Sequence, residues 1–165
     1  MLHKTTFLFI VILIYGMVLQ AKTITVCSSC EVTSIKQGVA IASPFDTLLI
    51  KKGIYKEVNI VIDKPLTLLG EGYPVIDGEN KGEIITIIAD NVTVDGLSII
   101  NVGTSYTADY AAVRVVKSKD FLIQNLRLEK LFFGIYLEKS RDGRVFNNKI
   151  IGDAVEEYNS GNGIQ

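Results

Sequence analysis

Apolar and polar residues alternate along this chain in short segments that return every 22 to 29 residues, each interrupted at the same point by Gly or Asn. Such alternation is the period of a strand with one buried face. Gly and Asn are the residues that most easily adopt a left-handed backbone conformation. A repeat of about 20 to 50 residues is typical of a solenoid. The aligned copies are Leu66–Gly70, Val92–Ile99, Phe121–Leu128 and Gly143–Ile150.

This repeat predicts an all-β fold, a right-handed single-stranded parallel β-helix in which each coil supplies a strand, a bend and a further strand. The apolar positions should point inward and stack between coils, because one face of each strand is buried. In two aligned copies these positions are Val92, Val94, Leu97, Ile99, Phe121, Ile123, Leu126 and Leu128.

A short capping α-helix is expected before the first full coil. Ser34 followed by Gln37 has the spacing of a capping box, and the apolar residues after it predict a helix over residues 35–42 that ends before Pro44. Such a helix would cover the open apolar end of the solenoid, which is otherwise an edge prone to aggregation.

The two ends of the chain differ from the repeat. His3 and Lys4, followed by the 13-residue run Phe7–Leu19, predict a secretory signal peptide over residues 1–21, with an uncleaved anchor as the alternative. The run is shorter than the roughly 20 apolar residues of a membrane span. Residues 22–165 are then the N-terminal coils of a β-helix domain. Ser160–Gln165 resembles the start of another coil, so we expect the chain to be truncated at the C-terminus.

The composition limits which functions the chain can have. It contains 17 Lys and Arg residues and 18 Asp and Glu residues, and it has no basic patch of the kind that binds nucleic acid. The single His and both Met residues lie in the predicted signal peptide. The exported part therefore lacks the commonest general base and the commonest metal ligand.

Cys27 and Cys30 form a CxxC pair with three interpretations. In an exported protein the pair is expected to form a local disulfide. Two thiolates also suit Cu(I) or zinc, which makes Cys27 and Cys30 the candidate metal ligands. A redox-catalytic pair would require the start of a helix in a βαβ unit, and a β-helix lacks that context.

Two longer segments, Gly103–Tyr110 and Gly152–Gly161, occupy the same part of successive repeats and should stack on one side as the working surface. The second carries Asp153, Glu156 and Glu157, which are either a carboxylate group for sugar chemistry or a solvated loop. Four tyrosines are candidates for stacking on sugar rings or for sealing the edge of the core: Tyr106, Tyr110, Tyr136 and Tyr158.

The outward positions of the strands offer few functional groups. Asp95, Gln124 and Phe146 are expected to stack in one column, and their different chemistries argue against a repeated metal ladder. An enzymatic outer face would require Asp95 and Arg127 to lie close together. At the bend, Asn125, Asn147 and Asn148 predict a ladder of amides along the axis.

Several segments resemble known families. Thr47–Glu57 looks like the opening coil of pectate-lyase-like β-helices. The detailed sequence is similar to NosD-type periplasmic copper-binding proteins, which carry carbohydrate-binding and sugar-hydrolase-like repeats. The segments that carry this second resemblance are Ile62–Glu71, Val75–Gly78, Asp90–Leu97 and Tyr158–Ile164.

The NosD resemblance implies a non-enzymatic periplasmic role: assisting nitrous oxide reductase maturation, alongside a membrane transporter, by supplying copper or sulfur to a copper-sulfide centre. Cys27 and Cys30 are then the only candidate Cu(I) ligands of the exported segment. The rival expectations are a polysaccharide-active lyase, epimerase or methylesterase, a carbohydrate-binding solenoid, and an adhesive scaffold without chemistry.

Overall fold

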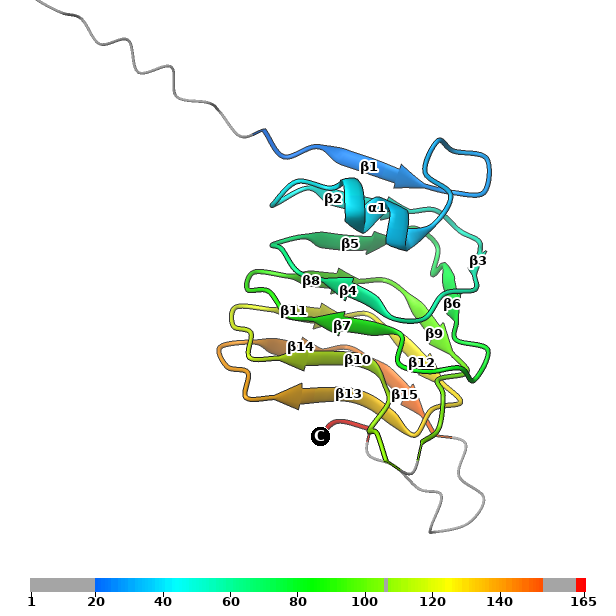
Figure 1. The fold of residues 1–165 in the computed structure, drawn as a ribbon, viewed down its shortest axis with the longest axis vertical. Coiled ribbons are helices and arrows are strands. Elements are labelled where there is room, and N and C mark those ends of the chain that lie inside the picture. The colour runs from blue at the N-terminus through cyan, green and yellow to red at the C-terminus, as the bar shows by residue number, and fades with distance from the viewer. Residues whose placement is uncertain (1–19, 106, 153–162) are drawn as a thin grey trace, which may run out of the picture.

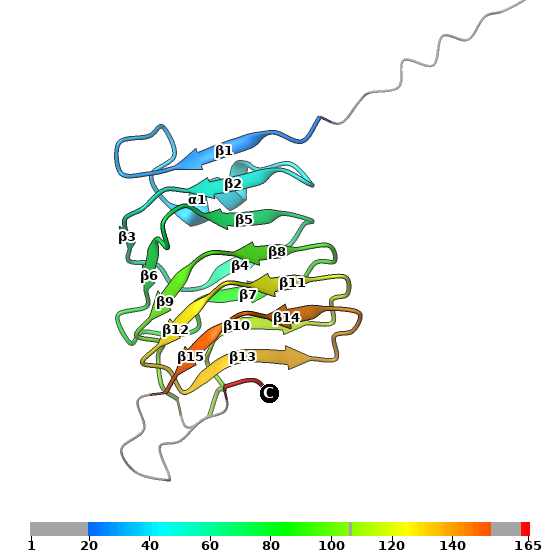
Figure 2. The ribbon, with the colours of Figure 1, turned by 180° about the vertical axis from the view of Figure 1, so that it is seen from behind.

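The computed structural model describes residues 20–105, 107–152 and 163–165, which form three parallel sheets wound into a solenoid (Figure 1). From the second coil onward, each coil adds one strand to each sheet in turn. The coils wind in the right-handed sense as the chain descends from its N-terminal end, which both views show (Figures 1 and 2). The predicted right-handed parallel β-helix is therefore confirmed.

The three sheets are named A, B and C after the order in which a coil enters them. Sheet A has six strands, in the order β1 (Thr23–Val26), β2 (Thr47–Ile50), β5 (Thr67–Gly70), β8 (Thr93–Asp95), β11 (Leu122–Gln124) and β14 (Arg144–Phe146). Sheet B has five, in the order β3 (Ile54–Tyr55), β6 (Val75–Asp77), β9 (Ser98–Ile100), β12 (Arg127–Glu129) and β15 (Lys149–Ile151). Sheet C has four, in the order β4 (Ile60–Ile62), β7 (Ile85–Ile87), β10 (Ala111–Val116) and β13 (Phe133–Glu138).

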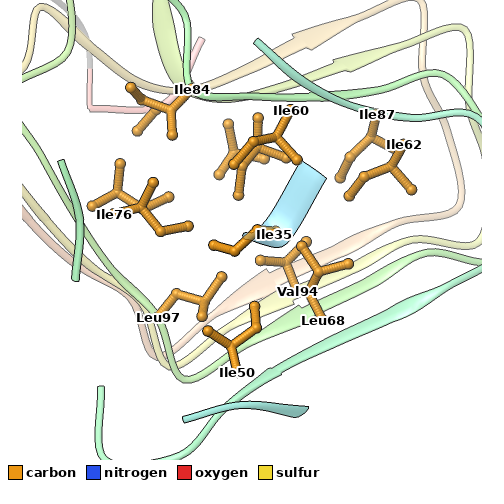
Figure 3. Packing of buried hydrophobic residues seen from close by; sticks show 14 of the residues in the cluster. Ile35, Ile50, Ile60, Ile62, Leu68, Ile76, Ile84, Ile87, Val94 and Leu97 are labelled. Atoms are coloured by element: carbon orange, nitrogen blue, oxygen red, sulfur yellow. The ribbon is translucent and has the colours of Figure 1, made fainter. Parts of the chain in front are cut away.

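The core consists of apolar columns that run along the axis, because each inward residue pairs in register with an inward residue of the next coil. Fully burying one Leu, Ile or Val side chain contributes about 1.5–3 kcal/mol, so the columns supply the main stabilising free energy. Figure 3 shows Ile35, Ile50, Val94 and Leu97 converging from different elements. The inward column of sheet A is Ile24, Leu48, Leu68, Val94, Ile123 and Val145.

All eight positions that the sequence predicts to be inward are buried, with 4% or less of each side chain exposed. The prediction holds because the strand period of two alternates side chains between the core and the solvent. The eight are Val92, Val94, Leu97, Ile99, Phe121, Ile123, Leu126 and Leu128.

The bend between sheets A and B uses the left-handed conformation that the Gly and Asn residues predicted. Gly96, Asn125 and Asn147 have φ of 71°, 55° and 56°. Gly70 is the exception, since its φ is not positive. A Cβ at Gly70 would lie 2.3 Å from the carbonyl oxygen of Gly96, so close approach of two coils explains this glycine.

The capping helix is α1 (Ile35–Ile41), and the predicted 35–42 helix is confirmed with Ala42 as its C-cap. The Gln37 N–H donates to Ser34 Oγ at 3.1 Å, as in a capping box. The Gln37 side chain does not return to Ser34, because its Oε1 accepts from the N–H of Thr33 at 3.3 Å.

Helix α1 packs directly on the first coils. Gly38 permits this approach, because a Cβ there would lie 2.8 Å from Leu48 Cδ2. Ile35 is fully buried and closes the N-terminal end of the core (Figure 3). The helix thus covers the end of the solenoid, as expected.

The predicted signal peptide lies almost entirely outside the described residues, which begin at residue 20. Within the described part of the chain, no helix is long and apolar enough to cross a membrane.

Candidate functional site

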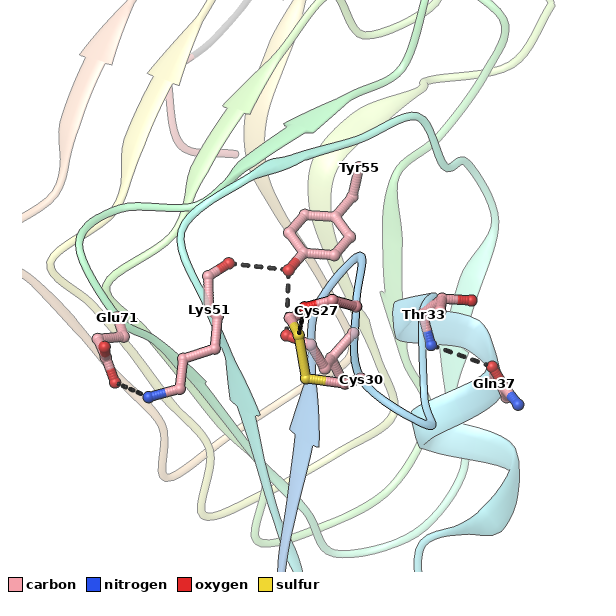
Figure 4. The surroundings of a disulfide bond; sticks show 9 residues. Cys27, Cys30, Thr33, Gln37, Lys51, Tyr55 and Glu71 are labelled. Carbon is pink, nitrogen blue, oxygen red and sulfur yellow. Dashed lines mark hydrogen bonds and ion pairs between the residues drawn. A yellow bond between two sulfur atoms is a disulfide. The ribbon is translucent and has the colours of Figure 1, made fainter.

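The CxxC pair lies on a turn that follows β1 at the N-terminal end of the solenoid. Cys27 and Cys30 are joined by a disulfide, and both are partly exposed (Figure 4). The Cys30 N–H donates to the Cys27 carbonyl at 3.2 Å, and the Cys27 N–H donates to the Val32 carbonyl at 3.1 Å. The turn therefore closes a loop that returns to the end of β1 in the same direction, where Val26 forms a parallel bridge with Val32.

Tyr55 fixes the strand end from which this turn departs. Its hydroxyl lies 3.1 Å from the Val26 carbonyl and 2.8 Å from the Lys51 carbonyl (Figure 4). Burial raises the pKa of Tyr55, and the charge of Glu57 adds to the effect. The phenol thus stays a neutral donor at physiological pH and holds the turn in one place.

Of the three interpretations of the cysteine pair, the structure shows the disulfide. Metal binding requires thiolates, so the interpretation of Cys27 and Cys30 as metal ligands concerns the reduced pair and stays a prediction. Among residues 20–105, 107–152 and 163–165, no group of three or more His, Cys, Asp or Glu side chains is placed to hold a metal ion. Within that part, a soft metal would have only the two sulfurs.

The outward column of sheet A has the predicted register. Asp95 pairs with Gln124, and Gln124 pairs with Phe146. Both oxygens of Asp95 are already engaged, since Gln124 Nε2 donates to Oδ2 at 2.6 Å and Asn125 Nδ2 donates to Oδ1 at 2.7 Å. Asn147 Nδ2 in turn donates to Asn125 Oδ1, so Asn125 and Asn147 form the predicted axial ladder and Asp95 terminates it. Asn148 lies outside the ladder, because its amide accepts from the Leu126 N–H and donates to the Ile123 carbonyl.

The pair expected of an enzymatic outer face is not formed. Arg127 stacks on the ring of Tyr73, with its Cζ 3.6 Å from the ring centroid. No ion pair joins Arg127 to Asp95 among the described residues, and Asp95 is held by amides of its own sheet. Arg127 and Asp95 therefore make separate local contacts and do not form the pair that an enzymatic outer face would require.

Of the candidate tyrosines, the structure describes two. Tyr110 packs partly against the core, as expected of an edge-sealing residue. The rings of Tyr136 and Phe133 pack edge-to-face with their centroids 5.8 Å apart. The Arg114 Cζ lies over the Tyr136 ring, 4.5 Å from its centroid. Tyr106, Tyr158 and the acidic group Asp153, Glu156 and Glu157 lie outside the described residues, as does most of the second long segment.

The outer face of sheet C carries a charged cluster that was not predicted from the sequence. The Arg114 Nε donates to Glu83 Oε2 at 2.5 Å, and its Nη1 lies 3.7 Å from Glu138 Oε2. The Arg114 and Glu83 side chains are only 18% and 12% exposed, which leaves this pair little screened by solvent. Arg114 Nη2 also donates to the carbonyl of Asp109. One arginine therefore links three successive coils and the long segment before β10.

This cluster has a signal that could have been noticed. Arg114 is the one charged residue in the otherwise apolar strand Ala111–Val116. Its neighbours in register are Thr86 on one side and Tyr136 on the other, and the carboxylates of Glu83 and Glu138 reach it from outside that register. The cation is already matched to carboxylates and a carbonyl, so the cluster braces the coils and the segment rather than offering a free catalytic group.

A second charged group lies in a hollow of about 350 Å³ between α1 and the bends of the next two coils. Glu79 accepts from Lys56 at 2.8 Å and from Lys81 at 2.6 Å. These hydrogen bonds and charges lower the pKa of Glu79 to about 2. The carboxylate is thus ionised throughout the physiological range.

Taken with the fold, these features define a class: a parallel β-helix with a helix-covered N-terminal end, a disulfide-closed turn at that end, and internally neutralised charges on its faces. Over 108 residues, 64% of its length, the chain is 34% identical to a Pseudomonas aeruginosa protein described as a probable ABC transporter binding protein NosD. A Stutzerimonas stutzeri protein with the same description is 33% identical over 108 residues. The chain is homologous to NosD over these 108 residues, and its β-solenoid fits a NosD-type β-helix protein.

The chain spans about a quarter of the length of the curated relatives it matches, at 25% of each. No family model matches the chain. No solved structure matches it either.

Proposed function

We propose that this chain is part of a NosD-type accessory protein of the periplasm that works with an ABC transporter and assists assembly of the copper centre of nitrous oxide reductase. The observation that carries the proposal is the sequence relationship to two NosD proteins over 108 residues, within a β-solenoid. Both relatives are named as probable ABC transporter binding proteins.

The Cys27–Cys30 disulfide supports export, because disulfides persist in oxidising compartments such as the periplasm. The copper part of the proposal assigns Cu(I) as cargo to the same pair after a periplasmic dithiol reductant has reduced the disulfide by thiol–disulfide exchange and has itself become a disulfide. Two thiolates are soft ligands that suit Cu(I), whereas the carboxylates and amides of the solenoid do not. The partly exposed turn at the end of β1 leaves both sulfurs open to a donor or an acceptor of the metal.

The test is a chimera, because the chain matches only a quarter of each relative. In a Pseudomonas aeruginosa strain that lacks its own NosD, the matching region of NosD is replaced by this sequence, and the copper content of nitrous oxide reductase is measured. Restored copper supports the proposal. A chimera that is produced and exported in normal amounts, yet leaves the reductase without copper, contradicts it.

The matched control is a chimera with Cys27→Ser and Cys30→Ser. Loss of copper loading in this control alone would assign the cargo step to the cysteine pair. Full loading in the control would leave the NosD-type role standing and remove the pair from it.

A further inference from the structure

The connection between α1 and β2 exposes apolar side chains at the N-terminal end of the solenoid. Ile41, the last residue of α1, is 52% exposed, and Phe45 is 56% exposed. Pro44 between them is also exposed. We call residues 41–45 the Ile41–Phe45 segment.

The backbone of Phe45 is the unusual feature of this segment. Its φ is 71°, in the left-handed region that bulky L-residues avoid. The other aromatic residue with positive φ in the described chain is Tyr73, whose ring is covered by Arg127. No ring or cation contact covers Phe45 among the described residues, so its strained placement gains no corresponding contact within the fold.

The surrounding structure holds Phe45 in this conformation. Its N–H donates to the Pro65 carbonyl at 2.7 Å. The next residue, Asp46, is 1% exposed and accepts from the N–H groups of Ser43 at 2.8 Å and Lys22 at 2.9 Å. Burial by itself raises the pKa of Asp46, but these two hydrogen bonds and the Lys22 charge outweigh it and lower the pKa. The Asp46 carboxylate therefore stays ionised and keeps both hydrogen bonds.

An exposed aromatic residue whose backbone is fixed by hydrogen bonds, at a cost in backbone strain, suits a binding surface. Strained residues cluster at ligand clamps and binding sites. Preorganised aromatic anchors carry much of the affinity in protein interfaces, because little conformational entropy is lost when they bind. Beside α1 lies a hollow of about 310 Å³ that can receive a partner side chain, and its walls are both apolar and charged. They come from Lys36, Val39, Ala40, Ile60, Val61, Asp63 and Lys64.

We propose that the Ile41–Phe45 segment is the surface through which this protein docks on its ABC transporter, with the Phe45 ring entering an apolar pocket of the transporter. The inference rests on the proposed transporter partnership and adds to it the contact surface and its chemistry. It also explains why a residue that suits the backbone poorly occupies the position.

The test measures binding of the full chain to the ABC transporter of Pseudomonas aeruginosa NosD in lipid nanodiscs, with that NosD as the positive control. Phe45→Asn removes the ring and supplies a residue that tolerates the left-handed conformation. We expect an equal or higher Tm together with a Kd weakened about tenfold or more. Ile41→Ser should also weaken binding.

The matched control is Ile54→Ser, which removes a side chain that is 71% exposed in β3, away from the segment. Unchanged affinity in this control, with weaker binding by Phe45→Asn, supports the docking surface. Equal loss in the control would overturn it, because general apolar exposure would then decide binding. Equal affinity of Phe45→Asn and wild type would overturn the docking surface and leave the transporter partnership intact.

Two further outcomes separate the underlying proposals. If wild type fails to bind while Pseudomonas aeruginosa NosD binds, the transporter partnership itself is contradicted, and the docking surface with it. If wild type binds empty nanodiscs and Phe45→Asn does not, the ring contacts lipid. The proposal that the ring enters an apolar pocket of the transporter is then overturned.

Discussion

Glu57 accepts a hydrogen bond from the backbone N–H of Ile35 across 22 positions of the chain, at 2.7 Å. The other oxygen of the same carboxylate accepts from the N–H of Lys36 at 3.0 Å. The first N–H groups of a helix have no partner within the helix. At the other end of α1, Lys64 donates to the carbonyls of Val39 and Ala42 at 3.2 Å and 3.4 Å. Residues on either side of β4 thus clamp both ends of the capping helix.

Glu57→Gln should lower the free energy of unfolding by about 1–2 kcal/mol, because an amide can accept only one of the two N–H bonds and sets its own NH₂ against the other. Urea unfolding followed by circular dichroism measures the change. The matched control is Glu71→Gln, which breaks the exposed pair with Lys51 and should cost less than about 1 kcal/mol. Equal losses in the two variants would show that Glu57 is not a helix cap.

Gly70→Ala should be strongly destabilising even though Gly70 has no positive φ. The new Cβ would lie 2.3 Å from the Gly96 carbonyl oxygen and 2.8 Å from Leu97 Cδ2, so β5 and β8 would have to separate. Overpacking of this kind costs about 1–3 kcal/mol or more. Gly53→Ala is the control, since its nearest atom would be Tyr55 Cε2 at 3.5 Å, an ordinary contact. Thermal unfolding that ranks the two variants the other way would refute the close approach of the coils.

The features that the sequence predicted well are those that repeat locally. Ile123 and Leu128 are inward because each strand alternates its side chains over a few residues, and that period is visible without knowing which strands pair. The bend residues Asn125 and Asn147 were predicted for the same reason, because a left-handed position favours Asn wherever it occurs.

The features that could not be predicted depend on the offset between coils. Arg114 meets Glu83 from 31 positions away, and the coil between them is lengthened by an irregular segment, so no fixed spacing points to the pair. Phe45 reads as an ordinary apolar residue before a strand, and its positive φ becomes visible only with the backbone. Similarly, the chemical state of Cys27 and Cys30 is not determined by their spacing.

Glu79 should titrate with a pKa of about 2 instead of 4.5, because hydrogen bonds from Lys56 and Lys81 favour its ionised form. A lowered pKa in the folded state contributes stability that is fully present above the unfolded value of about 4.5 and is lost as the pH falls toward about 2. Carboxyl chemical shifts followed by NMR during an acid titration measure the value directly.

Lys81→Met should raise the pKa of Glu79 toward its ordinary range, since one of the two donors is removed. Added salt should raise it as well, because the group is partly exposed and the Lys charges are screened. Lys52→Met is the control, as this exposed lysine makes no ion pair in the described structure. A Glu79 pKa near 4.5 in the unaltered protein would contradict the contacts of the hollow.

The reduced protein should bind about one equivalent of Cu(I), because the two thiolates are the soft ligands of residues 22–165. Cys27→Ser with Cys30→Ser should abolish this uptake, and the oxidised protein should not bind, since its sulfurs are joined in the disulfide. Titration against a competing Cu(I) chelator under reducing conditions measures the affinity of each form. Reduction should leave the fold intact, because the disulfide closes a turn of sequence separation 3, whereas the columns of the core span every coil. Unchanged uptake by the double serine variant would show that Cys27 and Cys30 are not the copper ligands of this segment.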